Sequence, residues 1–167
     1  VTVDDSLGNV VATGMQFASN GYLVTGDPIT LTPDLSAGGV STIRVGDGTS
    51  ASASMTATIN SILAGGAAVV KDDLGTLVLN GTNTYTGGTS VLGGTLQISS
   101  DANLGISTSN LTIANGSSLR TTDTFTSNRT VVLGSSGGVF DTTAGTQLTL
   151  AGPITQGSTG ARLGKTG

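Results

Sequence analysis

Short runs in which apolar and polar residues alternate recur along the whole chain, and Gly, Asn, Asp or Ser bounds each run. Alternation with a period of two places every second side chain on the same face, so these runs predict half-buried β-strands separated by turns. The predicted strands cover residues 2–5, 15–18, 22–25, 29–32, 41–45, 76–80, 95–99, 111–115, 118–122, 130–134, 138–142 and 147–151.

Equivalent apolar positions recur at about one turn of a three-faced β-helix. Leu77 and Leu96 are 19 residues apart, Leu111 and Val131 are 20 apart, and Val131 and Leu148 are 17 apart. A repeat near 20 residues is typical of a solenoid, whose coils stack about 4.8 Å apart. The predicted fold class is therefore all-β, a parallel β-helix (β-solenoid). The expected buried rungs are Leu77, Leu79, Leu96 and Ile98.

The small residues between these strands predict the corners. Gly87-Gly88 and Gly93-Gly94 are expected to supply positive φ angles there. Thr84, Thr86 and Thr89 are expected to point outward or into corners, with Tyr85 covering one corner. Residues 46–66 fit the pattern least, and they are either a lateral loop or two degenerate coils.

The composition agrees with a folded chain that contains almost no helix. Glu is absent, and Thr, with 29 residues, and Gly, with 27, are abundant. Thr, Val and Ile favour strands, whereas the residues that favour helices are scarce. A mean hydropathy of +0.22 and 36% hydrophobic residues provide enough apolar surface to argue against disorder.

The charge of the chain and the length of its apolar runs exclude two kinds of interaction. The net charge is −4 and Lys and Arg do not cluster, so no nucleic-acid partner is expected. No apolar run approaches the roughly 20 residues that a membrane span requires, so no membrane insertion of this segment is expected.

The chain lacks the residues of most hydrolytic sites. Without His or Cys it cannot form a Ser-His-Asp or Cys-His apparatus or an HExxH metal site, and no Ser lies three residues before a Lys. We therefore expect no enzyme activity, no catalytic or cofactor-binding residues, no metal ligands and no cofactor.

Several polar features leave alternatives open. Asp4-Asp5, Asp72-Asp73 and the set Arg120, Asp123, Arg129 and Asp141 are either solvated loop charges or, for the last set, a lateral patch that binds or cleaves sugar. Gly46-Asp47-Gly48 is either a plain turn or a faint calcium-turn motif. The Asn-x-Ser/Thr triplets at Asn80, Asn110, Asn115 and Asn128 are either turn and ladder residues or glycosylation acceptors.

Residues 70–105 resemble the autotransporter-associated β-strand repeat. The match includes Gly75-Thr76-Leu77, Asn83-Thr-Tyr-Thr-Gly-Gly-Thr89 and Gly94-Thr95-Leu96, whereas Asp73 stands where the family has Gly. Residues 161–167 look like the start of a further copy, with Lys165 in the place of Lys71. Residues 1–167 are expected to form a single β-helix segment.

This resemblance implies a right-handed parallel β-helix, a fragment of a longer passenger of a Gram-negative type V secretion system. Its expected place is the cell surface or the medium, after export across the outer membrane through the C-terminal β-barrel translocator of the parent protein. The implied function is a non-enzymatic stalk or adhesive surface for adhesion, autoaggregation or biofilm. Its partners would be other passengers, by self-association, or a host-cell or glycan receptor. The alternatives are a repeat that promotes folding and translocation, and a polysaccharide-processing β-helix enzyme.

Overall fold

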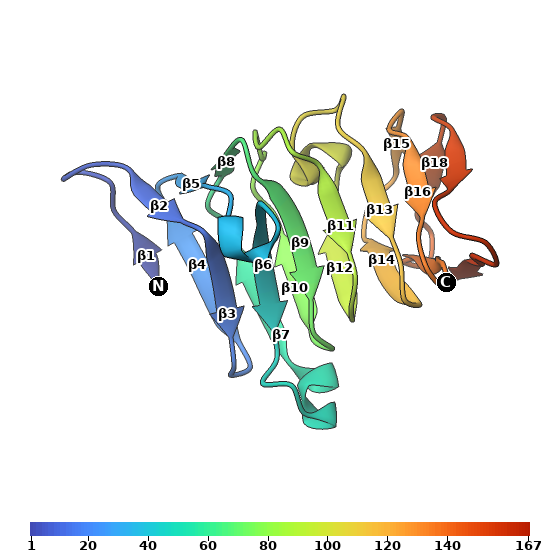
Figure 1. Cartoon of the computed structure of the whole chain (residues 1–167), viewed down its shortest axis with the longest axis horizontal. Helices are drawn as coiled ribbons and strands as arrows, with labels where there is room; N and C mark the ends of the chain where they lie inside the picture. The colour runs from blue at the N-terminus through green and yellow to red at the C-terminus, as the bar shows by residue number, and fades with distance from the viewer.

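The chain forms a three-sided parallel β-helix in the computed structural model, which describes all 167 residues (Figure 1). All strand pairs are parallel, and consecutive strands lie on different faces, so the chain winds around one axis. The predicted fold class is confirmed. Helical structure is confined to three 3-10 segments, η1 (Leu35–Ala37), η2 (Ser50–Ser54) and η3 (Asp101–Leu104). No helix is long and apolar enough to span a membrane.

Two of the three faces are continuous sheets. The eight-stranded face consists, in spatial order, of β1 (Thr2–Val3), β4 (Tyr22–Gly26), β7 (Thr56–Ile59), β10 (Thr76–Leu79), β12 (Thr95–Ile98), β14 (Ser117–Thr121), β17 (Gly138–Thr142) and β20 (Leu163–Thr166). The seven-stranded face consists of β3 (Gly14–Phe17), β6 (Val40–Val45), β9 (Ala68–Asp72), β11 (Thr89–Val91), β13 (Leu111–Ile113), β16 (Val131–Leu133) and β19 (Ile154–Gln156).

The third face is interrupted in the middle of the molecule. Its two short sheets are β2 (Val10–Ala12), β5 (Ile29–Leu31) and β8 (Leu63–Gly65) at one end, and β15 (Phe125–Ser127) with β18 (Leu148–Leu150) at the other. Between them, residues 80–88 and 99–110 contain no strand. Side chains must replace part of the strand hydrogen bonding there, because buried backbone groups need partners.

Inward side chains stack into aliphatic ladders along both continuous faces. Leu77 pairs with Leu96 and Leu79 with Ile98, and all four predicted rungs are buried. The register between Leu111 and Val131 is also confirmed. The Val131–Leu148 spacing is wrong, because Val131 pairs with Ile154 and Leu148 lies on the third face opposite Phe125. The spacing between paired rungs varies, from 19 residues between Leu77 and Leu96 to 23 between Val131 and Ile154, so one fixed period does not describe the coils.

The corners follow the predicted pattern only in part. Gly88 and Gly94 have φ angles of 88° and 60°, as expected. Gly87 and Gly93 do not have positive φ, and they are glycines because a neighbouring backbone passes close by: a Cβ on Gly87 would lie 2.2 Å from the Ala68 nitrogen. Asp73, where the family has Gly, adopts a left-handed φ of 68°.

The three threonines of this stretch differ in their environment. Thr84 and Thr86 are exposed, as expected. Thr89 is buried in strand β11, so the prediction that it points outward or into a corner is wrong. Thr89 follows the exposed Thr86 by three residues, so it falls on the inward side with Tyr85 and Val91, and its hydroxyl lies 2.6 Å from the Tyr85 hydroxyl inside the coil.

Residues 46–66 combine both alternatives. Residues 46–55 leave the helix as a lateral loop that contains η2, whereas residues 56–65 supply β7 and β8 (Figure 1). The Asp47 carboxylate holds the loop together by accepting hydrogen bonds from the Thr49 amide (2.9 Å) and the Ser52 hydroxyl (2.7 Å). These bonds lower the pKa of Asp47 to about 2. In the Gly46-Asp47-Gly48 stretch, the Asp47 carboxylate therefore stabilises a turn within the loop.

Candidate interaction surfaces

The repeat motif contains a lysine that points into the core. Lys71 lies in β9 between two aliphatic rungs, and its side chain is fully buried. Its Nζ donates hydrogen bonds to the carbonyls of Asp72 (2.9 Å), Asp73 (2.8 Å) and Gly93 (2.9 Å). Gly93 belongs to the next coil, so this ammonium group ties two successive corners together.

Replacing Lys71 with methionine should change how stability depends on pH. Burial lowers the pKa of Lys71 to about 8, although the charges of Asp72 and Asp73 oppose the shift. The unfolded chain, with a lysine pKa near 10.4, then binds more protons between these values, so the contribution of Lys71 to stability rises with pH. We expect the unfolding free energy of the wild type, minus that of Lys71→Met, to increase by about 2 kcal/mol from pH 7.5 to pH 10.

Urea unfolding of both proteins at several pH values measures this difference. Lys165→Met is the control, because Lys165 is exposed. A difference that stays constant or falls with pH would contradict the expectation.

Two buried asparagines replace strand hydrogen bonds on the third face. The Asn83 side-chain oxygen accepts from the Leu63 amide at 2.8 Å, and its Nδ2 donates to the Asn103 carbonyl at 2.6 Å. The Asn103 Nδ2 in turn donates to the Gly81 carbonyl at 3.0 Å. These two amides connect three successive coils where the backbone forms no strand.

Tyr85 fills the interior between these coils. Its hydroxyl lies 2.6 Å from the Thr89 hydroxyl, which is also 3.3 Å from the Leu104 carbonyl. Burial raises the pKa of Tyr85 to about 12. A Cβ on Gly105 would lie 2.7 Å from the tyrosine ring, so glycine is required opposite the ring. The prediction that Tyr85 covers a corner is wrong, because the ring is fully buried.

Arg129 anchors the loop that follows β12. Its Nε donates to the Asp101 carboxylate at 2.9 Å, and its side chain is 1% exposed. Its two terminal nitrogens donate to the carbonyls of Ile106 (2.6 Å), Gly105 (2.7 Å), Asp101 (3.0 Å) and Ser109 (3.2 Å), and to the Ser109 hydroxyl (2.9 Å). One buried guanidinium therefore pins the whole loop.

The four charged residues considered as a patch that binds or cleaves sugar do not come together in the structure. Arg120 and Asp141 form an ion pair of 2.7 Å across β14 and β17. Asp123 is exposed beyond the end of β14, and Arg129 is inside the coil. Sequence reasoning missed the pairing of Asp72 with Arg44 at 3.7 Å, because the lateral loop interrupts the spacing between their coils. It also missed that Asp5 lies beside Asp27, whose charge raises the pKa of Asp5.

The asparagine triplets lie at turns and in ladders. Asn80 donates to the Asn60 side chain at 2.9 Å, and Asn115 has a φ of 57° and donates to the Leu92 carbonyl at 3.1 Å. Asn110 and Asn128 are exposed beside strand ends.

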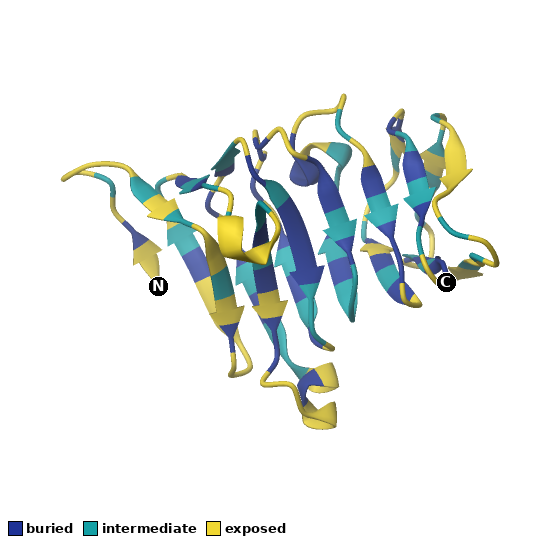
Figure 2. Ribbon diagram, viewed as in Figure 1, coloured by how far each residue is buried: buried dark blue, intermediate teal, exposed yellow.

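The outer side of the eight-stranded face carries a row of hydroxyl groups. Buried and partly exposed residues alternate along its central strands (Figure 2). In register across four adjacent strands, the outward row consists of Thr56, Thr76, Thr95 and Ser118. The neighbouring row holds Thr58, Val78 and Gln97 before it reaches the Arg120–Asp141 pair. Over β7, β10 and β12 these two outward rows contain no charged residue.

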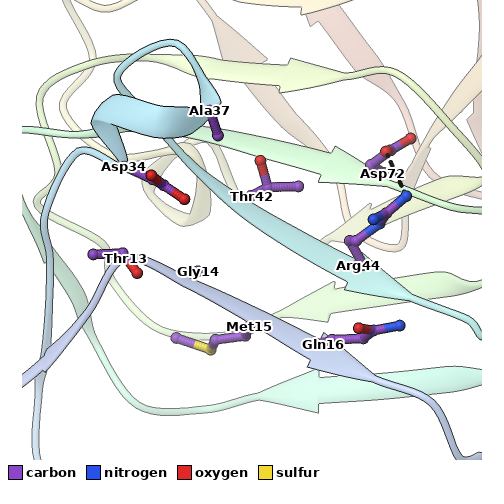
Figure 3. A pocket seen from close by; sticks show the side chains of 9 residues that line it. All are labelled: Thr13, Gly14, Met15, Gln16, Asp34, Ala37, Thr42, Arg44 and Asp72. Atoms are coloured by element: carbon purple, nitrogen blue, oxygen red, sulfur yellow. Dashed lines mark ion pairs between the residues drawn. The ribbon is translucent and has the colours of Figure 1, made fainter.

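A groove of about 500 Å³ opens on the seven-stranded face, beneath η1 (Figure 3). On its floor Gln16, Arg44 and Asp72 form one row across β3, β6 and β9. Asp34 lines the groove from the η1 side, and the Thr42 side chain lies between Asp34 and Arg44 (Figure 3). The groove therefore presents a cationic hydrogen-bond donor, anionic acceptors and neutral polar groups within one open site.

Comparisons with known proteins add two similarities. The passenger-associated-transport-repeat family matches residues 69–98. The Adhesin BmaC autotransporter of Brucella suis biovar 1 (strain 1330) is 51% identical over 154 residues, which cover 92% of this chain. The chain spans about 4% of the length of that curated relative. No solved structure matches.

Proposed function

The chain is a segment of an autotransporter passenger with a passenger-associated-transport repeat, exported to the cell surface, and from this premise we propose that it is a non-enzymatic adhesive stalk. The name of the relative supports adhesion, although the chain corresponds to a small part of that protein. A parallel β-helix suits a stalk, because each coil adds length and contacts its neighbours.

The observation that carries the proposal is the hydroxyl row on the eight-stranded face. A threonine hydroxyl both donates and accepts hydrogen bonds, so a flat row of them is complementary to a second copy of itself. The rows over β7, β10 and β12 lack charge, so two copies would not repel each other there. The proposed partner is therefore another passenger on a neighbouring cell, and the outcome is autoaggregation or biofilm.

A second function, in folding and export, is favoured by a different observation. The buried polar groups Lys71, Asn83, Asn103 and Arg129 gather in and beside the matched repeat. They tie successive coils together, so this part is expected to form stable structure early outside the outer membrane. In that case the repeat is a scaffold for a functional site elsewhere in the parent protein.

The structure offers less support for polysaccharide processing. Three charged residues, Asp34, Arg44 and Asp72, do line one groove. Hydrogen bonds from Ser36 lower the pKa of Asp34, so this carboxyl group stays ionised at neutral pH and is unsuited to act as a general acid. Binding without cleavage fits the groove better.

A deletion separates adhesion from export. The full passenger is displayed on a non-adhesive Gram-negative host with and without residues 70–105, and both the exposed passenger and the settling rate of the culture are measured. Loss of exposure assigns the repeat to folding and export. Unchanged exposure with loss of settling assigns it to adhesion, and unchanged settling at equal exposure contradicts the adhesive proposal.

Charges placed on the hydroxyl row test the proposed face directly. We expect the double variant Thr76→Glu and Thr95→Glu to abolish settling at unchanged surface exposure, because like charges would then meet across the interface. The matched control is Thr84→Glu with Thr86→Glu, which places the same charges on the third face. Equal loss in both variants would show that the eight-stranded face is not the contact surface.

A further inference from the structure

We propose that the groove between η1 and the seven-stranded face is a binding site for a neutral oligosaccharide. This site lies on a different face from the hydroxyl row, so it does not depend on self-association. Of the residues that line the groove, only Asp72 belongs to the matched residues 69–98, because β3, η1 and β6 precede them.

The polar groups of the groove have few partners within the protein. The only ionic or hydrogen-bonded contact of the Arg44 side chain is the 3.7 Å approach to Asp72, and the Arg44 side chain is 53% exposed. Asp34 uses Oδ1 to accept from the Ser36 amide (2.9 Å) and hydroxyl (2.6 Å), which leaves Oδ2 free. The Gln16 Nε2 donates to the Gly46 carbonyl at 3.3 Å, so its amide oxygen is free as well.

The arrangement of charges selects against charged ligands. Asp34 lies on the η1 side of the groove, and the paired Arg44 and Asp72 lie on its floor. An anionic ligand would meet two carboxylates, in a chain whose net charge is already −4. A cationic ligand would meet the exposed guanidinium of Arg44. A neutral ligand that both donates and accepts, such as a run of sugar hydroxyls, suits this mixture of free groups.

The shape of the groove is compatible with a short saccharide. Its volume of about 500 Å³ lies within the range of small-ligand sites. Gly14 lines the groove beside Thr42, and a Cβ there would lie 2.8 Å from the Thr42 backbone oxygen, so β3 and β6 pack closely only with glycine at this position. The η1 wall is held in place, because Asp34 caps η1 and its amide donates to the Val40 carbonyl at 3.0 Å. A preformed wall reduces the entropic cost of binding.

The groove has no aromatic ring among its lining residues, so a single site is expected to bind weakly. Display of many passengers on one cell would compensate through multivalency.

Ligand-observed NMR on the chain of residues 1–167 tests the proposal. The probes are three neutral trisaccharides (maltotriose, cellotriose and triacetylchitotriose), with sialyllactose as an anionic and trilysine as a cationic comparator. We expect saturation transfer to at least one neutral trisaccharide and to neither charged probe. Arg44→Met should weaken this binding about tenfold, the size of effect expected when a charged donor is lost.

Arg120→Met is the matched control, because it removes an exposed arginine that is also paired with an aspartate, on the other continuous face. It should bind the saccharide as the wild type does, and both variants should keep the circular dichroism spectrum and the urea midpoint. Three outcomes overturn the proposal: no neutral trisaccharide binds, Arg44→Met binds unchanged, or only a charged probe binds. Settling of cells that display Arg44→Met should not change, so failure of this site is distinguishable from failure of self-association.

Discussion

Replacing Arg129 with methionine is expected to lower the free energy of unfolding by about 3–5 kcal/mol, the usual cost of removing one partner of a buried ion pair. The guanidinium makes six hydrogen bonds from a site that is almost fully buried. Methionine fills part of the volume but leaves the Asp101 carboxylate and four loop carbonyls without this donor. Urea unfolding monitored by circular dichroism measures the loss.

Two further variants distinguish the stability contributed by the Arg129 hydrogen bonds from that contributed by its positive charge. Arg120→Met removes an exposed arginine, so it should cost no more than about 1 kcal/mol. Arg129→Lys keeps the charge but offers three donors in place of five, so it should recover only part of the stability. Equal losses for Arg129→Met and Arg120→Met would contradict the role of Arg129 as the anchor of this loop.

Replacing Leu96 with aspartate is expected to cost several kcal/mol and to unfold the central coils at ambient temperature. Leu96 is completely buried, and its ladder neighbours are Leu77 and Leu119, so a carboxylate there would have no partner. Thermal unfolding of the variant measures the effect. On displayed passengers, the same change should lower the exposed amount.

Thr95→Asp is the control, because Thr95 is adjacent in sequence but faces outward. Its expected cost is within about 1 kcal/mol. A one-residue slip of register would exchange the two faces, so a larger loss for Thr95→Asp than for Leu96→Asp would contradict the assigned register.

Local chemistry made much of the fold predictable. All twelve predicted runs contain a strand, because alternation and turn residues are properties of a few consecutive residues. The rungs Leu77, Leu79, Leu96 and Ile98 were identifiable because their coils are nearly equal in length. Short strands such as β2 (Val10–Ala12) and β19 (Ile154–Gln156) escaped prediction, since three residues show too little alternation to stand out.

The groove shows where such reasoning stops. In the sequence, Asp72 stands out only as part of the acidic dipeptide Asp72-Asp73, and nothing distinguishes Arg44 or Asp34. Asp34 and Arg44 are separated from each other by the η1 turn, and Arg44 and Asp72 by the lateral loop of residues 46–55. These irregular insertions destroy the spacing from which the register could be calculated, so only the folded coil reveals that the three side chains meet.

The sequence by itself determined the all-β character, the solenoid architecture and the family motif, because these depend on residue type and on spacing within one or two coils. Only the tertiary structure decided which polar residues are internal. Lys71, Thr89 and Arg129 look like surface residues in the sequence, yet they are buried. The physical reason is that each of them has a hydrogen-bond partner in another coil: the Gly93 carbonyl for Lys71, the Leu104 carbonyl for Thr89 and the Asp101 carboxylate for Arg129. Those partners offset the cost of burial, and they come together only when the coils stack.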